Sequence, residues 1–326
     1  MNKYFFTFVV FIIAFYSCQN DDGVTNTETD SISQPMDTIP TPDPDPNPDP
    51  DLQPDPNPEP ESMLFYDSFE SGDKSATNAD GFSWGGSGGN MSIITSSQVV
   101  YQGNEQVAIP KSSVENASPD WTAKDGEHSL RFRYLAGGNT AEQRFDLGSA
   151  YPEIWCRYWL RVPMNFEHGS DSPSNHKLFA LWMDGYSVHG TGPTIVWNPW
   201  NNGNDGSRLT LVYKEGGSGG TGPHEQSQPW ITYPDDQGRW MQIVLHAKAS
   251  SGQNTNDALI ETYRKWGNET EFTLIHRLED INMPFPTVGP NGWAAGYIMG
   301  WVNAPYAEDT EWLLDQFTVS TNSLLE

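Results

Sequence analysis

The sequence has few cysteines, few basic residues and no long apolar segment, and each shortage excludes a class of protein. Its two cysteines are Cys18, near the start, and Cys156, so the chain after residue 62 has no pair for an intramolecular disulfide. Its 17 lysines and arginines face 43 aspartates and glutamates, a formal net charge of −26. Such a chain repels polyanions on average, which argues against nucleic acid as a partner.

The longest apolar run covers residues 4–16 and has the features of an export signal. It holds 13 residues, is interrupted by Thr7 and is preceded by Lys3. A transmembrane helix needs about 20 apolar residues, so this run is too short for a permanent membrane span. A positive residue before a short apolar run is typical of a signal peptide, which we expect over residues 1–17.

The residues around Cys18 bear on how that signal is removed. Residues 15–18 (FYSC) resemble the lipobox of bacterial lipoproteins, and residues 19–22 (QNDD) resemble the acidic export tag of surface lipoproteins of the Bacteroides group. The resemblance implies lipidation of Cys18, anchoring in the outer membrane and exposure at the cell surface. The alternative is a secreted protein that loses Cys18 with an ordinary signal peptide.

Residues 18–62 have the composition of a disordered linker. Residues 35–60 contain 11 prolines, most of them next to Asp or Asn. Proline fixes φ and removes the amide donor, so this tract favours extended polyproline II at about 3.1 Å per residue. Twelve acids against one base in residues 1–62 add mutual repulsion. We therefore expect an arm that holds residues 63–326 away from the membrane.

Residues 63–326 are expected to form one all-β domain. Short segments rich in aromatic and β-branched residues alternate with Gly, Asn and Asp, which is typical of sandwiches and barrels. In one of them, IWCRYWLRV, we expect Cys156 to be a buried structural thiol. The expected strands cover residues 128–135, 141–147, 154–162, 176–182, 193–198, 207–214, 239–249, 257–266, 271–278, 296–302 and 311–319.

Segments spread over this domain also carry a family resemblance. They are FYDSFESGD, GEHSLRFRY, AEQRFDLG, IWCRYWLRVP, GRWMQIVLHAK, GYIMGWVN and WLLDQFTVS. Together they resemble the concanavalin A-like jelly roll of polysaccharide lyases, glucanases and laminin-G-type lectins. The resemblance implies a jelly-roll β-sandwich that acts on extracellular polysaccharide, and it implies no single activity.

Strand alternation places five arginines on the polar faces of three expected strands. They are Arg131, Arg133, Arg144, Arg157 and Arg161. Polysaccharide lyases of this type bind the uronate carboxylate with Arg, Gln or Asn. The resemblance therefore implies that Arg131, Arg144 and Arg157 neutralise a carboxylate and that Arg133 and Arg161 bind substrate. The alternative is that all five pair with neighbouring acids.

A lyase also needs a base and an acid for β-elimination. Lyases of this type remove the C5 proton with His or Tyr, so the resemblance implies His176 or His246 as the base and Tyr186 as the acid. The family's arginine-rich RTELR-type strand and its QIH motif are absent from the sequence. The ExDxxE motif of retaining glucanases is absent too, which disfavours hydrolysis.

The function that the resemblance implies first is cleavage of an acidic glycan by β-elimination. The alternative is capture of a glycan, without cleavage, for a neighbouring uptake system. Aromatic rings in Gly- and Asn-rich loops can stack on sugar faces, while amides and cations meet hydroxyls and carboxylates. The expected substrate-binding residues, in addition to the two arginines, are Lys177, Trp197, Trp200, Gln242 and Lys248, with Tyr213 and Trp230 as further candidate rings.

A structural Ca²⁺ is the expected cofactor. Similar sandwiches hold calcium with carboxylate and carbonyl oxygens where their first and last strands meet. In this sequence Asp67 and Glu70 lie at the start of the domain and Asp315 near its end. A charge pair or a solvated turn would explain the same residues. The oligomeric state is left open by the sequence.

Overall fold

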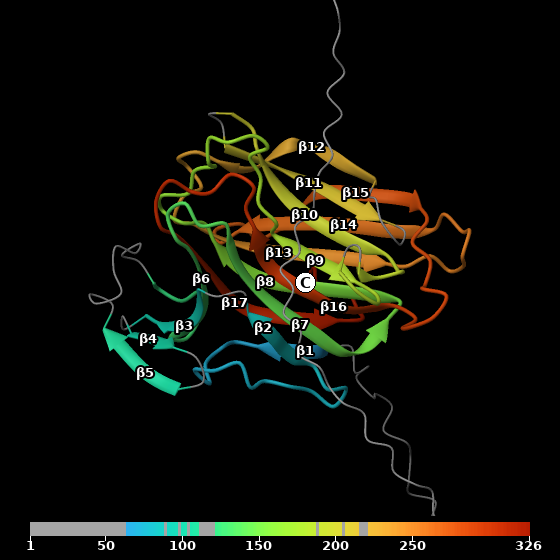
Figure 1. The fold of residues 1–326 in the computed structure, drawn as a ribbon, viewed down its shortest axis with the longest axis horizontal. Coiled ribbons are helices and arrows are strands. Elements are labelled where there is room, and N and C mark those ends of the chain that lie inside the picture. Colours follow the sequence, from blue (N-terminus) through green and yellow to red (C-terminus); the bar gives the residue numbers. More distant parts are fainter. Residues whose placement is uncertain are drawn as a thin grey trace, which may run out of the picture. The chain divides into compact units, whose positions relative to one another are not determined.

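The structure, a computed structural model, describes residues 63–87, 90–96, 99–102, 105–110, 121–186, 189–203, 206–214 and 221–326. The expected signal peptide, Cys18 and the linker over residues 18–62 lie outside these residues and stay predictions. The described residues belong to one unit and form strands and loops (Figure 1). None of them lies in a helix long and apolar enough to cross a membrane.

The fold consists of two antiparallel sheets, which we call sheet A and sheet B. Sheet A has the order β15-β14-β13-β8-β17-β6-β3-β4-β5, with β1 paired to β17, and sheet B has the order β12-β11-β10-β9-β16-β7-β2. The strands of sheet A are β1 (Met63–Asp67), β3 (Met91–Thr95), β4 (Val99–Gln102), β5 (Glu105–Pro110), β6 (His128–Tyr134), β8 (Glu153–Arg161), β13 (Trp240–Lys248), β14 (Ala258–Trp266), β15 (Thr273–Ile281) and β17 (Thr310–Ser320). Those of sheet B are β2 (Ser83–Ser87), β7 (Thr140–Tyr151), β9 (Phe179–Trp182), β10 (Thr194–Asn201), β11 (Gly206–Lys214), β12 (Thr221–Thr232) and β16 (Trp293–Trp301).

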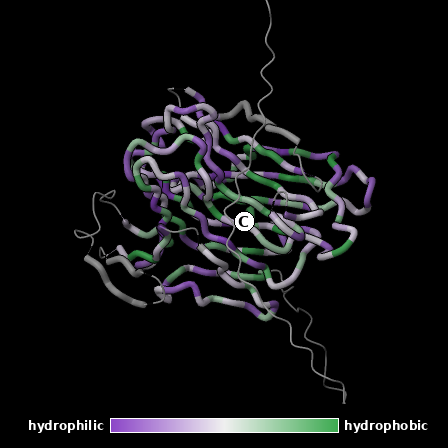
Figure 2. The backbone as a smooth tube through the Cα atoms, in the orientation of Figure 1, coloured by the Kyte–Doolittle hydropathy of each residue, from purple (hydrophilic) through white to green (hydrophobic). Residues whose placement is uncertain are grey.

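The two sheets bury a common hydrophobic core. In β8 the side chains of Ile154, Cys156, Tyr158 and Leu160 alternate into it, and the other strands contribute in the same way. Hydrophobic and hydrophilic positions alternate along the strands accordingly (Figure 2). The all-β jelly-roll sandwich predicted from the sequence is therefore confirmed. Burial also raises the pKa of the Cys156 thiol, which fits a structural role.

Each of the eleven expected strands overlaps a strand of the structure. The sequence did not predict β1 to β5 or β12. The reason is clearest for β12, the last strand of sheet B, whose sequence TGPHEQSQPWIT contains two prolines. An edge strand tolerates proline because one row of its amide groups needs no partner, so the usual strand pattern is lost there.

Candidate functional site

Three side chains are joined by hydrogen bonds on the outer face of sheet B. Lys177 Nζ donates to the Tyr186 hydroxyl over 2.9 Å, and the Tyr186 and Tyr297 hydroxyl oxygens are 3.0 Å apart. Lys177 precedes β9, Tyr186 lies in the loop after β9, and Tyr297 is on the neighbouring strand β16. Two connecting segments and one strand therefore meet at the Tyr186 hydroxyl.

Aromatic packing holds this group away from the main core. Trp182 and Tyr297 belong to a separate buried cluster, and Tyr186 packs against it with its ring 5.5 Å from Trp182 and 5.2 Å from Tyr297. In β9 the alternate residues Phe179 and Leu181 belong to the main core. Because successive side chains of a strand point to opposite faces, Trp182 and its cluster lie on the outer face.

Two charged residues of β7 lie beside Tyr297. Arg144 is directly opposite Tyr297 in the β7–β16 pairing, and Glu142 is opposite Met299, two residues further along β16. Arg144 Nε donates to Glu142 Oε1 over 2.7 Å, while half of the Arg144 side chain remains exposed. Lys177 and Arg144 therefore place positive charge on both sides of the two tyrosines.

Burial keeps the Tyr297 hydroxyl protonated. Tyr297 has no exposed surface, and its burial, followed by the proximity of Tyr186, raises its pKa well above the usual value. Tyr297 therefore keeps its proton and can donate it to the Tyr186 oxygen, although either hydroxyl can act as the donor. When Tyr297 donates, the Tyr186 oxygen accepts from both Lys177 and Tyr297. An oxygen held by two donors can release a proton and take it back.

Of the five predicted arginines, Arg144 is the one on sheet B. Arg131 and Arg133 are on β6 of sheet A, where Arg131 pairs with Glu311 at 3.0 Å and Arg133 with Asp309 at 2.6 Å. The side chain of Arg131 is 6% exposed and that of Glu311 1% exposed, so this pair is buried. The alternative interpretation, pairing with acids, therefore describes these two arginines.

The other two predicted arginines, Gln242 and Lys248 also lie on sheet A. Arg157 and Arg161 are on β8 and donate to backbone oxygens, Arg161 Nε to Gly238 over 3.0 Å. Gln242 and Lys248 are on the adjacent strand β13. A single carboxylate-binding face made of Arg131, Arg144 and Arg157 is thus wrong, because the core separates Arg144 from the other two. Sequence alternation identifies the face of one sheet but does not say which sheet a strand joins.

The two predicted histidine bases are not placed for proton transfer to a polymer. His176 is 1% exposed, and its ring lies 5.7 Å from Phe166 and 5.4 Å from Trp312. Burial lowers its pKa well below the usual value. We therefore correct the assignment of His176 as a base, because its ring is buried in the interior of the protein.

His246 lies on the outer face of sheet A. Its Nδ1 is 2.8 Å from Glu261 Oε2, its Nε2 is 2.8 Å from Glu153 Oε1, and its ring stacks on Trp155 at 3.8 Å. Both ring nitrogens are thus engaged by carboxylates. His246 is also separated by the core from Tyr186, so the two do not form a base and acid pair.

Some of the aromatic rings predicted for binding are part of the core. Trp197 and Trp230 have no exposed surface, and Tyr213 is 6% exposed. Trp197 Nε1 donates to Thr262 of the opposite sheet over 2.7 Å, so it connects the two sheets. Trp200 is half-buried and, by alternation from Trp197, lies on the outer face of sheet B.

The three predicted calcium ligands are engaged by other groups. Asp67 accepts from Trp84 Nε1, and Glu70 accepts from the His128 amide. Asp315 Oδ2 accepts two backbone amides, whereas its buried Oδ1 has no hydrogen-bond partner among the residues that the structure describes. Within the described residues, no group of three or more His, Cys, Asp or Glu side chains is arranged to hold a metal ion. Calcium stays a prediction.

Tyr297 is the residue of this site that the sequence did not single out. It belongs to GYIMGWVN, a segment interpreted as structural because its alternation matches a strand. Lys177, Tyr186 and Arg144 were all named, but as separate contributors. One feature of the sequence could have indicated Tyr297. It is a tyrosine on the same strand face as the small residue Ala295, at a position where an apolar side chain is more common.

Comparisons with known proteins concern the fold. No family model matches the chain, and no curated protein matches its sequence. Among solved structures, the PL-14 alginate lyase from Aplysia kurodai is 11% identical over 61% of this chain and 85% of its own, with a TM-score of 0.46. Alginate lyase Aly36B in complex with alginate tetrasaccharide is 12% identical over 73% of this chain and 99% of its own, with a TM-score of 0.45.

A structure of another kind is similar to the same extent. The receptor-binding domain of botulinum neurotoxin type G is 9% identical over 81% of this chain and 48% of its own, with a TM-score of 0.41. These structures resemble the chain in fold, and the comparison gives no information about the side chains of the site. The chemistry therefore rests on the contacts of this chain's own residues.

Proposed function

We propose that this protein is a polysaccharide lyase that cleaves an acidic glycan by β-elimination on the outer face of sheet B. The observation that carries the proposal is the hydrogen-bonded chain Lys177–Tyr186–Tyr297, with Arg144 beside it. This arrangement combines a proton carrier, two donors that stabilise its anion, and an arginine that pairs with Glu142 yet keeps half of its side chain exposed to a carboxylate.

In the proposed reaction Tyr186, as the phenolate, takes the proton from C5 of a uronate residue. The electron pair of the broken C5–H bond forms the C4=C5 double bond, and the C4–O4 bond breaks with its electrons going to O4. The Tyr186 phenol then gives its proton to O4, which restores the phenolate. Lys177 and Tyr297 stabilise the phenolate, and Arg144 neutralises the carboxylate, which lowers the cost of negative charge at C5.

The test is elimination by the purified protein and its Tyr186→Phe variant. Alginate, pectin, glucuronan and glycosaminoglycans are incubated with each, and the ultraviolet absorbance of the unsaturated products is followed. Because general acid–base groups contribute about 10²- to 10⁴-fold, we expect Tyr186→Phe to lose activity by that factor. The matched control is Tyr263→Phe, on β14 of sheet A, which should keep wild-type activity.

The same panel distinguishes cleavage from capture. If no acidic polymer gives an absorbance rise with the wild type, while a polymer slows its migration in an affinity gel, the elimination proposal fails and the protein is a glycan-binding protein. If Tyr186→Phe keeps full activity, elimination occurs elsewhere and the assigned site is wrong.

The polysaccharide partner we propose is extracellular. A lipid at Cys18 would anchor the protein in the outer membrane, and the linker over residues 18–62 would carry the sandwich outward. The support for this placement is the resemblance of residues 15–22 to lipoprotein signals and the proline-rich composition that follows.

A further inference from the structure

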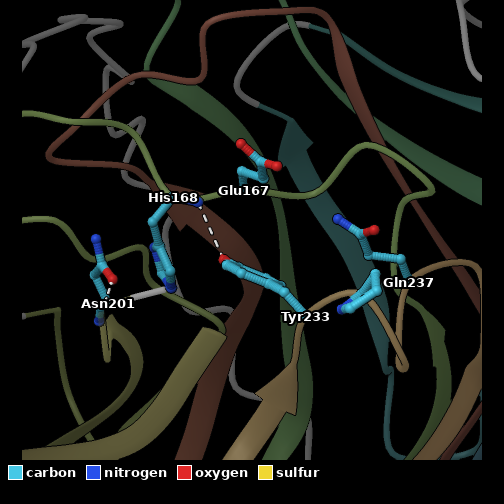
Figure 3. A pocket seen from close by; sticks show the side chains of 7 residues that line it. Glu167, His168, Asn201, Tyr233 and Gln237 are labelled. Atoms are coloured by element: carbon cyan, nitrogen blue, oxygen red, sulfur yellow. Dashed lines mark hydrogen bonds between the residues drawn. The ribbon is translucent and has the colours of Figure 1, made fainter. Parts of the chain in front are cut away.

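A cleft of about 460 Å³ lies at one end of the sandwich, where three loops meet. Glu167 and His168 come from the loop between β8 and β9, Asn201 from the end of β10, and Tyr233 and Gln237 from the loop between β12 and β13. Figure 3 shows the Tyr233 ring between His168 and Gln237, with Glu167 above them. The site on the outer face of sheet B uses none of these side chains.

The polar groups of the cleft are held in place by the backbone. The His168 amide donates to the Tyr233 hydroxyl over 3.1 Å, and Gln237 Nε2 donates to the Phe166 carbonyl over 2.8 Å. The Tyr233 ring also packs against Phe166 at 5.7 Å. These contacts leave the Gln237 carbonyl oxygen for a ligand, whereas the Tyr233 hydroxyl also interacts with the Ser207 side chain. The cleft therefore presents a fixed acceptor beside an aromatic ring.

The charge of the cleft excludes an acidic ligand. None of the described residues that line it is Lys or Arg, and Glu167 is exposed. Burial lowers the pKa of His168 to about 4, so this ring is neutral at neutral pH. A carboxylate would therefore meet a negative charge and no cation. Amides, a phenol and an aromatic ring are instead the groups that bind the hydroxyls and the apolar face of an uncharged sugar.

Covalent catalysis does not explain this cleft. His168 Nε2 is 2.7 Å from Ser207 Oγ, which is the spacing of a base and a nucleophile. However, Ser207 has no exposed surface, so its hydroxyl cannot reach a bound substrate. The contact instead fixes the His168 ring, and the cleft is suited to binding.

The segment from Ser174 to Lys177 connects the cleft to the site on sheet B. The Asn201 amide donates to the Ser174 carbonyl over 2.9 Å, and Lys177 follows Ser174 by three residues. At about 3.3 Å per extended residue, Ser174 beside the cleft and Lys177 in the site on sheet B are roughly 10 Å apart along the backbone. A short run of linked sugars can span that separation.

We infer that the cleft binds an uncharged sugar residue of the polysaccharide whose uronate residue lies at Lys177 and Tyr186. The second half of this inference rests on the proposed function. It specifies the substrate class as a mixed polymer that contains both uronate and neutral residues, rather than a pure polyuronate.

The experiment measures binding of neutral oligosaccharides to the full-length protein by calorimetry. The probes are gluco-, manno-, xylo- and galacto-oligosaccharides, with oligomannuronate and oligogalacturonate as acidic competitors. We expect at least one neutral probe to bind and Gln237→Ala to weaken it about 3- to 10-fold, the effect of one hydrogen bond. The matched control is Gln253→Ala, because Gln253 Nε2 also donates to a phenylalanine carbonyl over 2.8 Å but lies outside the cleft.

Different results would contradict the cleft proposal and the elimination proposal. Tyr186→Phe should abolish the ultraviolet signal and keep neutral-probe binding, whereas Gln237→Ala should raise KM on a mixed polymer and leave kcat unchanged. If no neutral probe binds, if Gln237→Ala binds it like the wild type, or if the acidic probes displace it, the cleft assignment is wrong. If neutral binding persists while no polymer is cleaved, the cleft stands and the lyase proposal falls.

Discussion

Asp315 lies on β17 without exposed surface, and its two carboxylate oxygens have different surroundings. Oδ2 accepts the amides of Lys124 and Asp125 at 2.9 and 3.1 Å, whereas buried Oδ1 has no hydrogen-bond partner in the described part of the chain. Burial is the largest effect and raises the pKa of Asp315 to about 7. An ionised Asp315 is therefore costly in the folded state, and a protonated one is favoured.

We expect this residue to make the fold less stable as the pH rises. The folded-state pKa, about 7, lies above the ordinary carboxyl pKa of 3.8. The stabilisation by protonated Asp315 is therefore complete below pH 3.8 and is lost as the pH rises through about 7. Relative to Asp315→Asn, the free energy of unfolding of the wild type should fall between these values, with a slope approaching about 1.4 kcal/mol per pH unit. Urea unfolding at a series of pH values measures the slope.

Parallel pH profiles for the two proteins would contradict that assignment. Excess calcium at pH 8 provides the control, because a cation bound at Asp67, Glu70 and Asp315 would offset the cost of the ionised carboxylate. If the calcium prediction is right, calcium raises the unfolding midpoint of the wild type and leaves that of Asp315→Asn unchanged.

At the scale of elements, β16 is the strand that brings the site together. It lies between β7, which supplies Arg144 and Glu142, and β9, whose flanking segments supply Lys177 and Tyr186. Its Gly296 lets the three strands approach closely: a Cβ there would lie 2.4 Å from the Ala180 carbonyl oxygen and 2.4 Å from the Phe145 ring. The position of Tyr297 therefore depends on a neighbouring residue without a side chain.

We expect Gly296→Ala to destabilise the protein by about 1–3 kcal/mol, because overpacking forces backbone and ring to move. The change also shifts Tyr297 relative to Tyr186, so elimination activity should fall. Thermal unfolding and the ultraviolet assay measure the two effects. Gly86→Ala, on β2 of the same sheet, is the control, since a Cβ there meets none of the described residues within 4 Å. Equal midpoints for the two variants would show that β16 has room to adjust.

At the scale of the whole molecule, the two sheets differ in the chemistry of their outer faces. Sheet A carries paired arginines and the His246 network, whose charges are balanced by neighbouring acids. Sheet B carries the Lys177–Tyr186–Tyr297 chain and Arg144, which pairs with Glu142 but keeps half of its side chain exposed. We therefore expect a negatively charged glycan to bind more strongly to sheet B, although sheet A contains more arginines.

Anchoring of the molecule is tested through Cys18. We expect the wild type, expressed in a Gram-negative host of the Bacteroides group, to incorporate a labelled fatty acid and to partition into detergent. Cys18→Ser removes the thiol that would accept the lipid and should abolish both. Equal labelling of the two proteins, or a wild type found wholly in the medium, would instead favour the ordinary secretory signal.

Much of the fold was predictable because it depends on local patterns. The alternation in IWCRYWLRV predicted both the β8 strand and the burial of Cys156. The candidate site was predictable only in part. Lys177, Tyr186 and Arg144 were identified as polar residues near strands, but nothing in their spacing indicated that Tyr297, more than a hundred residues further on, completes the group.

The sequence by itself determined that this chain is an acidic, all-β protein. Its net charge follows from composition alone, and its strands follow from two-residue alternation among neighbouring residues. It also determined which side chains of each strand lie on one face. Only the tertiary structure decided which faces coincide, since strand order brings β7, β16 and β9 together and places β6 and β8 on the other sheet. Pairing between distant strands depends on the packing of the whole core, and that packing is why Tyr297 meets Tyr186 while Arg131 meets Glu311.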